Sequence, residues 1–313
     1  PYFIEESYGF RRGRSCHDAI RRLSHEMWVK PINYVIDADI KGFFDNVNHE
    51  HLIRFIEHRV EDNNLVRLII RFLKSGVMES GEIYKTEKGT PQGGNISPVL
   101  ANIYLHYVLD LWFKYVVRTT LKGYSQIIRY ADDFLILVEK EEDCEVILSL
   151  LKERLAKFDL ELSAEKTKLV RFSRRTTRAN QVEQSNGTFD FLGFTFYIGK
   201  SRQGKTMLRW KTSKSRFRRG LQSFKVYLKN NRNRLKLQII WKILISKLRG
   251  HYNYYGISGN GRSISIFYDK AVKLIFKWLN RRSQRHSFTW EHFSKYLKSY
   301  PLPTPKIYVR VYS

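Results

Sequence analysis

The sequence of 313 residues predicts an α+β domain over residues 1–200, followed by an all-α domain over residues 201–313. Three observations support this division. Short β-branched runs alternate with amphipathic helical patterns in the first part, which is typical of an antiparallel sheet backed by helices. From about Ser213 the periodicity is helical throughout, and residues 191–313 carry all the net charge. We expect the boundary between Gly199 and Ser213.

Strands of the first part are expected where β-branched and aromatic residues gather. These runs are residues 33–40 (NYVIDADI), the two halves of 126–138 (QIIRYADDFLILV) around a turn at Ala131 to Asp133, and a strand pair at 189–199. Residues 81–95 are dense in turn-forming residues, which indicates a hairpin or loop.

Helices of the first part follow from apolar spacing and start signals. Residues 51–76 predict two helices broken near Asn63. Ser97 followed by Pro98 predicts a helix with Ser97 as N-cap and proline at the first helical position. A further helix is expected around residues 147–158, where apolar residues share one face.

The second part predicts a small helical bundle. One apolar stripe covers residues 217–228 and a second covers 237–248, which we expect to end at Gly250 as a C-cap. A third stripe lies around residues 275–279, and a short fourth helix is expected at 289–297.

Composition narrows the class of protein. A hydrophobic content of 42% excludes a disordered chain, and no uncharged apolar run reaches the ~18 residues of a membrane span. The N-terminus lacks the pattern of a signal peptide and an initiator methionine. Cys16 and Cys144 are too few for a disulfide framework, so we expect a reducing, cytoplasmic setting.

The charge distribution indicates a nucleic-acid partner. Residues 191–313 contain 28 Lys and Arg against two acidic residues, whereas residues 1–190 contain 28 of each kind. A basic region that also has helical periodicity favours binding to a phosphate backbone, although a solvated basic surface is the alternative.

Acidic residues interrupt two of the predicted strands. Asp132 and Asp133 sit between apolar halves of a hairpin, and Asp37 and Asp39, two residues apart, share one face of another strand. If the two strands are neighbours, three carboxylates converge and repel one another. Mg²⁺ prefers such hard oxygen ligands together with substrate phosphates, and two ions can stabilise an in-line phosphoryl transfer.

Seven blocks in order resemble the group II intron-encoded reverse transcriptase/maturase family. They are SYGFRRGRSCHDAIRRL (7–23), VIDADIKGFFDNVNH (35–49), GTPQGGNISPVLANIYLHYVLD (89–110), IIRYADDFLILV (127–138), LELSAEKTKLV (160–170), FDFLGFTF (189–196) and LRGHYNYYGI (248–257). The resemblance covers essentially the whole chain. It implies a right-hand polymerase palm with partial fingers at residues 1–200, then a helical thumb, or maturase domain X.

The resemblance also implies the residues of a polymerase site. Asp39, Asp132 and Asp133 become the catalytic ligands of two Mg²⁺ ions, for which Mn²⁺ is the substitute. Asp39 is preferred to Asp37 because the family's aromatic gate lies five residues further on, where Phe44 stands. An ordinary core phenylalanine is the alternative for Phe44. The implied nucleotide-binding residues are Ile40, Phe44, Gln92, Gly93 and Lys166.

A second implied set binds nucleic acid. Its members are Arg11, Arg12, Arg14, Lys214, Arg216, Arg218, Arg219, Arg249, Tyr252 and Tyr254. The family usually has proline where Arg12 stands. The tyrosines have two interpretations: stacking on RNA bases or filling the seam between thumb helices.

The implied function is RNA-directed DNA polymerase with maturase activity. Its partners are group II intron RNA, an RNA template with a DNA primer, dNTPs and target DNA, in a bacterial cytoplasm. Family members carry a further finger segment ahead of these blocks, so the activity of these 313 residues alone is left to experiment. The alternatives are a maturase that binds RNA without polymerising, and a domesticated reverse transcriptase. Neither the oligomeric state nor the intron follows from the sequence.

Overall fold

The structure, a computed structural model, describes residues 3–74, 77–79, 82–84, 88–90, 94, 96–172, 187–201, 203–282 and 289–311. The chain divides into two compact units. The first comprises Pro1–Leu192 and Tyr197–Leu208, and the second comprises Gly193–Phe196 and Arg209–Ser313. Strands and helices mix in the first unit, whereas helices dominate the second, so the predicted fold class is confirmed.

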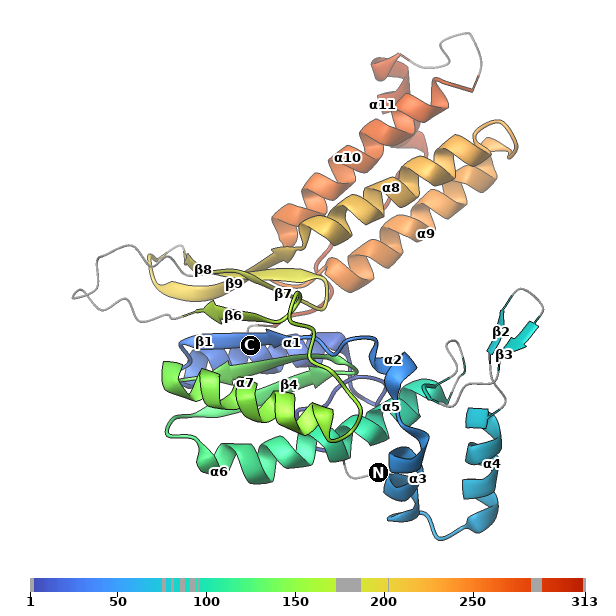
Figure 1. The fold of residues 1–313 in the computed structure, drawn as a ribbon. Coiled ribbons are helices and arrows are strands. Elements are labelled where there is room, and N and C mark those ends of the chain that lie inside the picture. Colours follow the sequence, from blue (N-terminus) through green and yellow to red (C-terminus); the bar gives the residue numbers. More distant parts are fainter. Residues whose placement is uncertain are drawn as a thin grey trace. The chain divides into compact units, whose positions relative to one another are not determined.

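A four-stranded antiparallel sheet forms the centre of the first unit. Its order is β4 (Ser125–Tyr130), β5 (Asp133–Val138), β1 (Tyr34–Ala38) and β6 (Lys168–Arg171), and every neighbouring pair is antiparallel. Figure 1 shows β1 and β6 of this sheet above the helices α5, α6 and α7. The two acidic strands predicted from the sequence, β1 and β5, are therefore neighbours.

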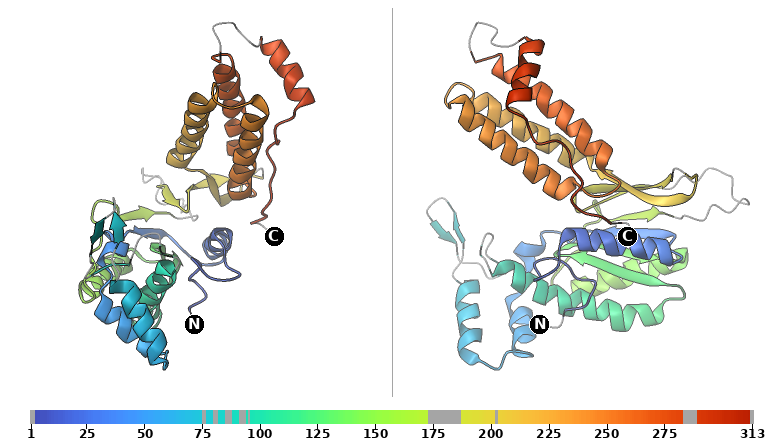
Figure 2. Two further views of the ribbon diagram at one scale, coloured as in Figure 1. Left: turned by 90° about the vertical axis from the view of Figure 1, so that its right-hand side faces the viewer. Right: turned by 180° about the vertical axis from the view of Figure 1, so that it is seen from behind.

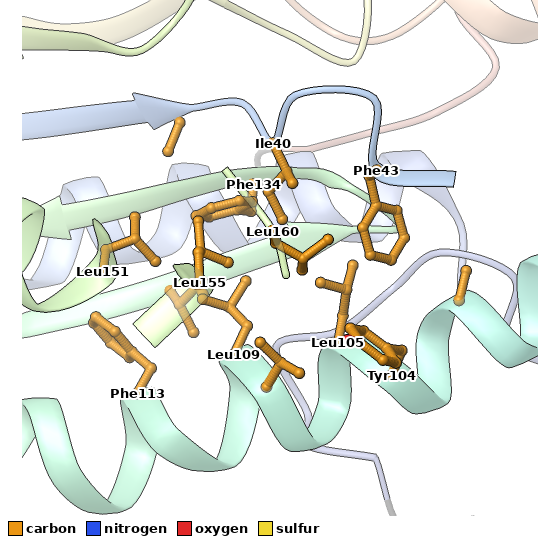
Figure 3. Packing of buried hydrophobic residues seen from close by; sticks show 14 of the residues in the cluster. Ile40, Phe43, Tyr104, Leu105, Leu109, Phe113, Phe134, Leu151, Leu155 and Leu160 are labelled. Carbon is orange, nitrogen blue, oxygen red and sulfur yellow. The ribbon is translucent and has the colours of Figure 1, made fainter. Parts of the chain in front are cut away.

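Two helical segments bury one face of this sheet. The first is a continuous helical run that contains α5 (Ser97–Leu105), two π-helical turns at His106–Asp110 and Phe113–Val117, and α6 (Arg118–Thr120). The second is α7 (Glu141–Ala156), which lies beside this run. Figure 3 shows side chains from both segments packing against Phe134 of β5. Burial of this apolar cluster, at about 25 cal/mol per Å², holds the sheet on its helices.

Helix α1 (Cys16–Val29) packs on β4 (Figure 2). Its start is fixed by a capping box, in which Ser15 and Asp18 each accept a hydrogen bond from the other's backbone N–H. Four short elements follow β1: α2 (Phe43–Asn46), α3 (His49–Glu57), α4 (Asn63–Lys74), and the hairpin β2 (Val77–Glu79) and β3 (Glu82–Tyr84).

Two predicted helix ends are wrong. Ile96 is the N-cap of α5 and Ser97 is already its first residue, with its N–H bonded to the Gly94 carbonyl. Gly250 does not end its helix but lies inside α9 (Leu237–Tyr255), whose C-cap is Gly256. A helical glycine costs only about 1 kcal/mol relative to alanine, and the apolar stripe continuing through Leu248 and Tyr252 outweighs it.

The second unit is a helical bundle, as predicted. Helices α8 (Lys214–Asn231), α9 and α10 (Gly261–Leu279) run side by side around a shared apolar core, and α11 (Trp290–Ser299) contributes Phe293 to it (Figure 2). A three-stranded sheet, β7 (Phe189–Phe191), β8 (Phe194–Lys200) and β9 (Thr206–Thr212), contains residues of both units. Within the part of the chain that the structure describes, no helix is long and apolar enough to cross a bilayer.

Candidate polymerase active site

The register of the sheet brings the predicted carboxylates together. Ala38 pairs with Phe134, so extending the antiparallel register by one residue sets Asp39 opposite Asp133. Asp37 lies two residues earlier on the same face of β1, diagonal to Asp133. Asp132 occupies the two-residue turn between β4 and β5, where Tyr130 pairs with Asp133. Three strand ends therefore present four carboxylates at one place.

The turn that carries Asp132 has an unusual backbone. Its first residue, Ala131, adopts a left-handed conformation with φ of +58°. This conformation is unfavourable for a residue with a Cβ atom, and such strain persists only where surrounding contacts determine it. The turn therefore depends on contacts from outside the hairpin.

Burial and mutual repulsion change the acidity of these groups. Burial, followed by the neighbouring Asp37, raises the pKa of Asp133 to about 7, although a backbone hydrogen bond from Leu192 opposes the rise. Burial likewise raises the pKa of Asp37 to about 6 and raises that of Asp132, to which Asp39 adds. Carboxyl groups whose pKa is raised by burial and by neighbouring carboxylates are typical of sites where a cation binds or a proton moves.

Lys166 pairs with Asp39. Its ammonium Nζ lies 3.0 Å from the Asp39 carboxylate Oδ2, and both side chains are substantially exposed. The backbone beside this pair is fixed, because Ser163 donates its N–H to the Asp39 carbonyl at 2.8 Å. The predicted lysine thus reaches the predicted metal ligand.

The donor set fits Mg²⁺ when substrate phosphates are included. Among the residues that the structure describes, no group of three or more His, Cys, Asp or Glu is close enough to hold an ion by itself. Asp39 is already paired with Lys166. Because Mg²⁺ usually takes one or two carboxylates, several waters and phosphate oxygens, the arrangement suits an ion that arrives with a nucleotide.

Phe44 lies on α2 beside the predicted nucleotide loop. Its ring is half-buried and meets Phe43 edge-on, with ring centroids 5.3 Å apart. Thr90 donates its N–H to the Phe44 carbonyl at 2.8 Å, and a Cβ atom on Gly89 would lie 2.9 Å from that same oxygen. The start of the loop is therefore held against Phe44. Gln92 and Gly93, which follow, lie outside the described residues.

Ile40 does not present its side chain to a nucleotide. The side chain is 5% exposed and packs in the core beneath the sheet (Figure 3). The reason is the alternation of β1, which sends Asp37 and Asp39 to one face and Ile36, Ala38 and Ile40 to the other. Only the main chain of Ile40 is left to face a nucleotide.

The three N-terminal arginines lie in different environments. Arg11 donates hydrogen bonds from Nη1 to the carbonyls of Ile4 and Ser7, within its own N-terminal segment. Its side chain is half-exposed. Arg12 is exposed, and the exposed Arg14 lies over the Tyr8 ring at 5.4 Å. The phosphate-binding prediction therefore suits Arg12 and Arg14 better than Arg11.

The predicted basic residues of the helical unit are all exposed. Lys214, Arg216, Arg218 and Arg219 lie in the first turns of α8, and Arg249 lies on α9. Tyr252 is a correction, because it is fully buried in the bundle core on the stripe of Leu244 and Leu248. Tyr254 is half-buried and stacks on Phe194, with centroids 6.1 Å apart.

Sequence reasoning missed the residues that support the turn carrying Asp132. Arg129, Asp110 and Asn102 are each at most 1% exposed, and Arg129 donates hydrogen bonds to both of the others and to the Ala131 carbonyl. The available signal was an arginine in an otherwise apolar strand, since a buried charge needs a partner. The partner lies 19 residues earlier, on a helix, and no local pattern identifies it.

A family model described as reverse transcriptase (RNA-dependent DNA polymerase) matches residues 1–196. The chain belongs to this reverse transcriptase family.

Individual relatives agree with the predicted branch of the family. The group II intron-encoded protein LtrA of Lactococcus lactis subsp. cremoris is 31% identical across 92% of this chain and 59% of LtrA. Protein YkfC of Escherichia coli (strain K12) is 29% identical across 64% of this chain and 57% of its own length. The predicted resemblance to group II intron-encoded proteins is confirmed, and the chain spans about three fifths of the length of these curated relatives.

A solved structure shares the fold. Apo telomerase from Candida Tropicalis aligns with 93% of this chain and 49% of its own chain, with a TM-score of 0.51 and 16% identity. At this identity the similarity concerns the fold alone.

Proposed function

We propose that this chain is an RNA-directed DNA polymerase of the group II intron type, which also binds intron RNA to assist splicing and mobility. The observation that carries the proposal is the antiparallel register of β1 and β5. It sets Asp39 opposite Asp133 and beside the Asp132 turn, at the edge of a sheet whose other face is fully packed.

The three carboxylates would hold two Mg²⁺ ions. When bound, such ions offset the charge of the triphosphate and favour the attack of a primer 3′-hydroxyl on the α-phosphate. The chain's own residues would position the triphosphate and offset its negative charge. We propose that the exposed Lys166, which pairs with Asp39, meets the anionic triphosphate, and that Phe44 packs under the sugar.

Exposed basic residues on the helical unit support RNA binding. Residues 214–231 form α8 and contain six Lys and Arg and no acid. Each phosphate neutralised releases counterions, so the affinity for RNA should fall steeply with salt. We propose intron RNA, an RNA template with its DNA primer, dNTPs and target DNA as partners. We propose a bacterial cytoplasm as the setting, since the similar LtrA comes from the bacterium Lactococcus lactis.

Primer extension tests this proposal. The chain, Asp132→Asn and the control Asp62→Asn are compared on an RNA template with Mg²⁺ and dNTPs. Asp62 is exposed between α3 and α4 and caps Asn64, which asparagine can also do. We expect extension by the chain and by Asp62→Asn, and a rate lower by roughly 10³-fold for Asp132→Asn.

RNA binding by the same three proteins separates the alternatives. We expect equal affinities, because Asp132 lies far from the basic helix α8 in sequence and adds no positive charge. If the unaltered chain binds RNA but does not extend the primer, the polymerase proposal fails for this chain. The binding result would then favour the RNA-binding maturase.

A further inference from the structure

Arg129 is completely buried and uses every donor of its guanidinium. Nε and Nη2 bind the two carboxylate oxygens of Asp110 at 2.7 and 2.5 Å, and Nη2 also donates to Ser7 Oγ at 2.9 Å. Nη1 donates to Asn102 Oδ1 at 3.0 Å and to the carbonyl oxygen of Ala131 at 2.8 Å. Five N–H groups thus meet five acceptors, which is the full capacity of an arginine.

One of those acceptors belongs to the catalytic turn. Ala131 is the left-handed residue that directly precedes Asp132, and its carbonyl is held by Arg129 from two residues earlier. Arg129 pairs with Phe134, so it points to the packed face of the sheet, away from Asp39 and Asp133. It can therefore support the turn but cannot touch a metal ion bound on the other face.

The same residue ties the turn to the N-terminal segment. Tyr8 donates its N–H to the Arg129 carbonyl at 2.9 Å, and Arg129 donates its own N–H to the Glu6 carbonyl at 3.0 Å. Asn102, which accepts from Arg129, donates to the Gly9 carbonyl at 2.6 Å. A hydrogen-bond network centred on Arg129 therefore links residues 6–9, helix α5 and the turn.

The helix that provides the counter-ion is also unusual. Asp110 ends a π-helical turn, a rare conformation that is often found at functional sites. Burial acts to raise the pKa of Asp110, but Arg129 and His106 outweigh it and hold that pKa below its usual value. Both side chains of the pair are fully enclosed.

We propose that Arg129, held by Asp110, is a positioning residue for the polymerase reaction. It fixes the backbone of the turn so that Asp132 and Asp133 stand in a binding geometry for the catalytic metal ions. This inference rests on the proposed function. It assigns to the buried pair a role beyond stability, because the pair controls the affinity of the carboxylates for divalent cations.

The test separates positioning from stability. Arg129→Met alone leaves Asp110 buried without its partner and is expected to lower the melting temperature strongly. Arg129→Met combined with Asp110→Leu removes both charges, which often restores stability, yet leaves the Ala131 carbonyl without its donor. Arg154→Met is the matched control, since Arg154 also holds helix carbonyls, those of Val108 and Tyr107, but does not contact the turn.

Three quantities are measured on the full chain: the melting temperature, the Mn²⁺ affinity by electron paramagnetic resonance in the presence of primer, template and a dNTP, and the Mg²⁺ dependence of primer extension. We expect the double variant to regain much of its melting temperature while binding Mn²⁺ about tenfold more weakly and extending roughly 10 to 100-fold more slowly. Arg154→Met should lower the melting temperature but leave the Mn²⁺ affinity and the extension rate unchanged. Raised Mg²⁺ should partly rescue the double variant.

Two results would overturn the inference. Unchanged Mn²⁺ affinity and Mg²⁺ dependence in the double variant would make the pair purely structural. An equal loss of metal affinity in Arg154→Met would mean that any loss of stability weakens the site. If the unaltered chain binds Mn²⁺ but does not extend, the polymerase proposal fails while the Mn²⁺ comparison still tests the positioning role.

Discussion

Gly9→Ala should disable the catalytic turn while leaving the fold intact. Gly9 lies directly against the hairpin tip, where a Cβ atom would sit 2.3 Å from the Ala131 nitrogen and 3.0 Å from the Tyr130 carbonyl carbon. Both neighbours are backbone atoms and cannot rotate away. Alanine therefore requires that either the N-terminal segment or the turn move.

The size of the movement follows from these distances. An ordinary contact begins at 3.4 Å, so the backbones must separate by about 1 Å. The N-terminal segment cannot easily yield, since Asn102 holds the Gly9 carbonyl and Arg129 pairs with residues 6–8. A misplacement of about 1 Å at a catalytic group costs roughly 10²-fold in rate, whereas overpacking costs about 1–3 kcal/mol in stability.

Primer extension and thermal unfolding measure the two effects separately. Gly250→Ala provides the matched control, because Gly250 lies inside α9, where an added Cβ atom would have no neighbour within 4 Å beyond the backbone of its own helix. We expect Gly250→Ala to gain roughly 0.5–1 kcal/mol and to extend normally. Gly9→Ala should melt several degrees lower and extend about 10²-fold more slowly.

A Gly9→Ala protein that melts lower but extends at the normal rate, with the normal Mg²⁺ requirement, would refute this expectation. That result would show that the N-terminal segment moves and the turn does not. A loss of folding in Gly9→Ala would be recognised by thermal unfolding before any rate is compared.

Three further predictions concern pH, sugar selection and RNA binding. Because the pKa of Asp37 is raised to about 6, its contribution to stability is fully present below about pH 4 and is lost as the pH rises through 6. Asp37→Asn should therefore raise the melting temperature more at pH 8 than at pH 4.5. The melting temperatures are measured with a chelator present, so that no metal ion is bound. In primer extension with competing ribo- and deoxynucleoside triphosphates, Phe44→Ala should increase the ratio of ribonucleotides to deoxynucleotides incorporated by roughly tenfold. An unchanged ratio would mean that Phe44 is an ordinary core residue. Changing three exposed basic residues of α8 to glutamine should weaken RNA binding and make the log–log salt slope shallower by about 2 to 3, whereas an unchanged slope would place the RNA elsewhere. The three residues are Lys214, Arg218 and Arg219.

Local patterns in the sequence were sufficient for most elements. Runs of β-branched and aromatic residues predict β1 and the β4–β5 hairpin, and helical periodicity predicts helices α7 to α11. The positions of the helix ends were predicted less accurately. Gly250 has the residue type of a C-cap, yet the apolar stripe that buries Tyr252 carries α9 past it.

The candidate metal ligands were also accessible from the sequence. Two aspartates inside an apolar hairpin are costly unless something compensates for them, so Asp132 and Asp133 stand out without any structure. The lysine at 166 and the aromatic residue at 44 came from the family blocks. What those blocks left open, such as whether Tyr252 faces RNA or the bundle core, depends on side-chain direction.

The sequence by itself determined the class of fold, the family and the residue types of the site, because periodicity, composition and ordered motifs are properties of the chain. Tertiary structure alone decided which distant groups meet. It set Asp39 opposite Asp133, joined Lys166 to Asp39, and enclosed Arg129 with Asp110, Asn102 and the turn. Strand register and helix packing create those contacts, and they arise from the core as a whole rather than from any local stretch of residues.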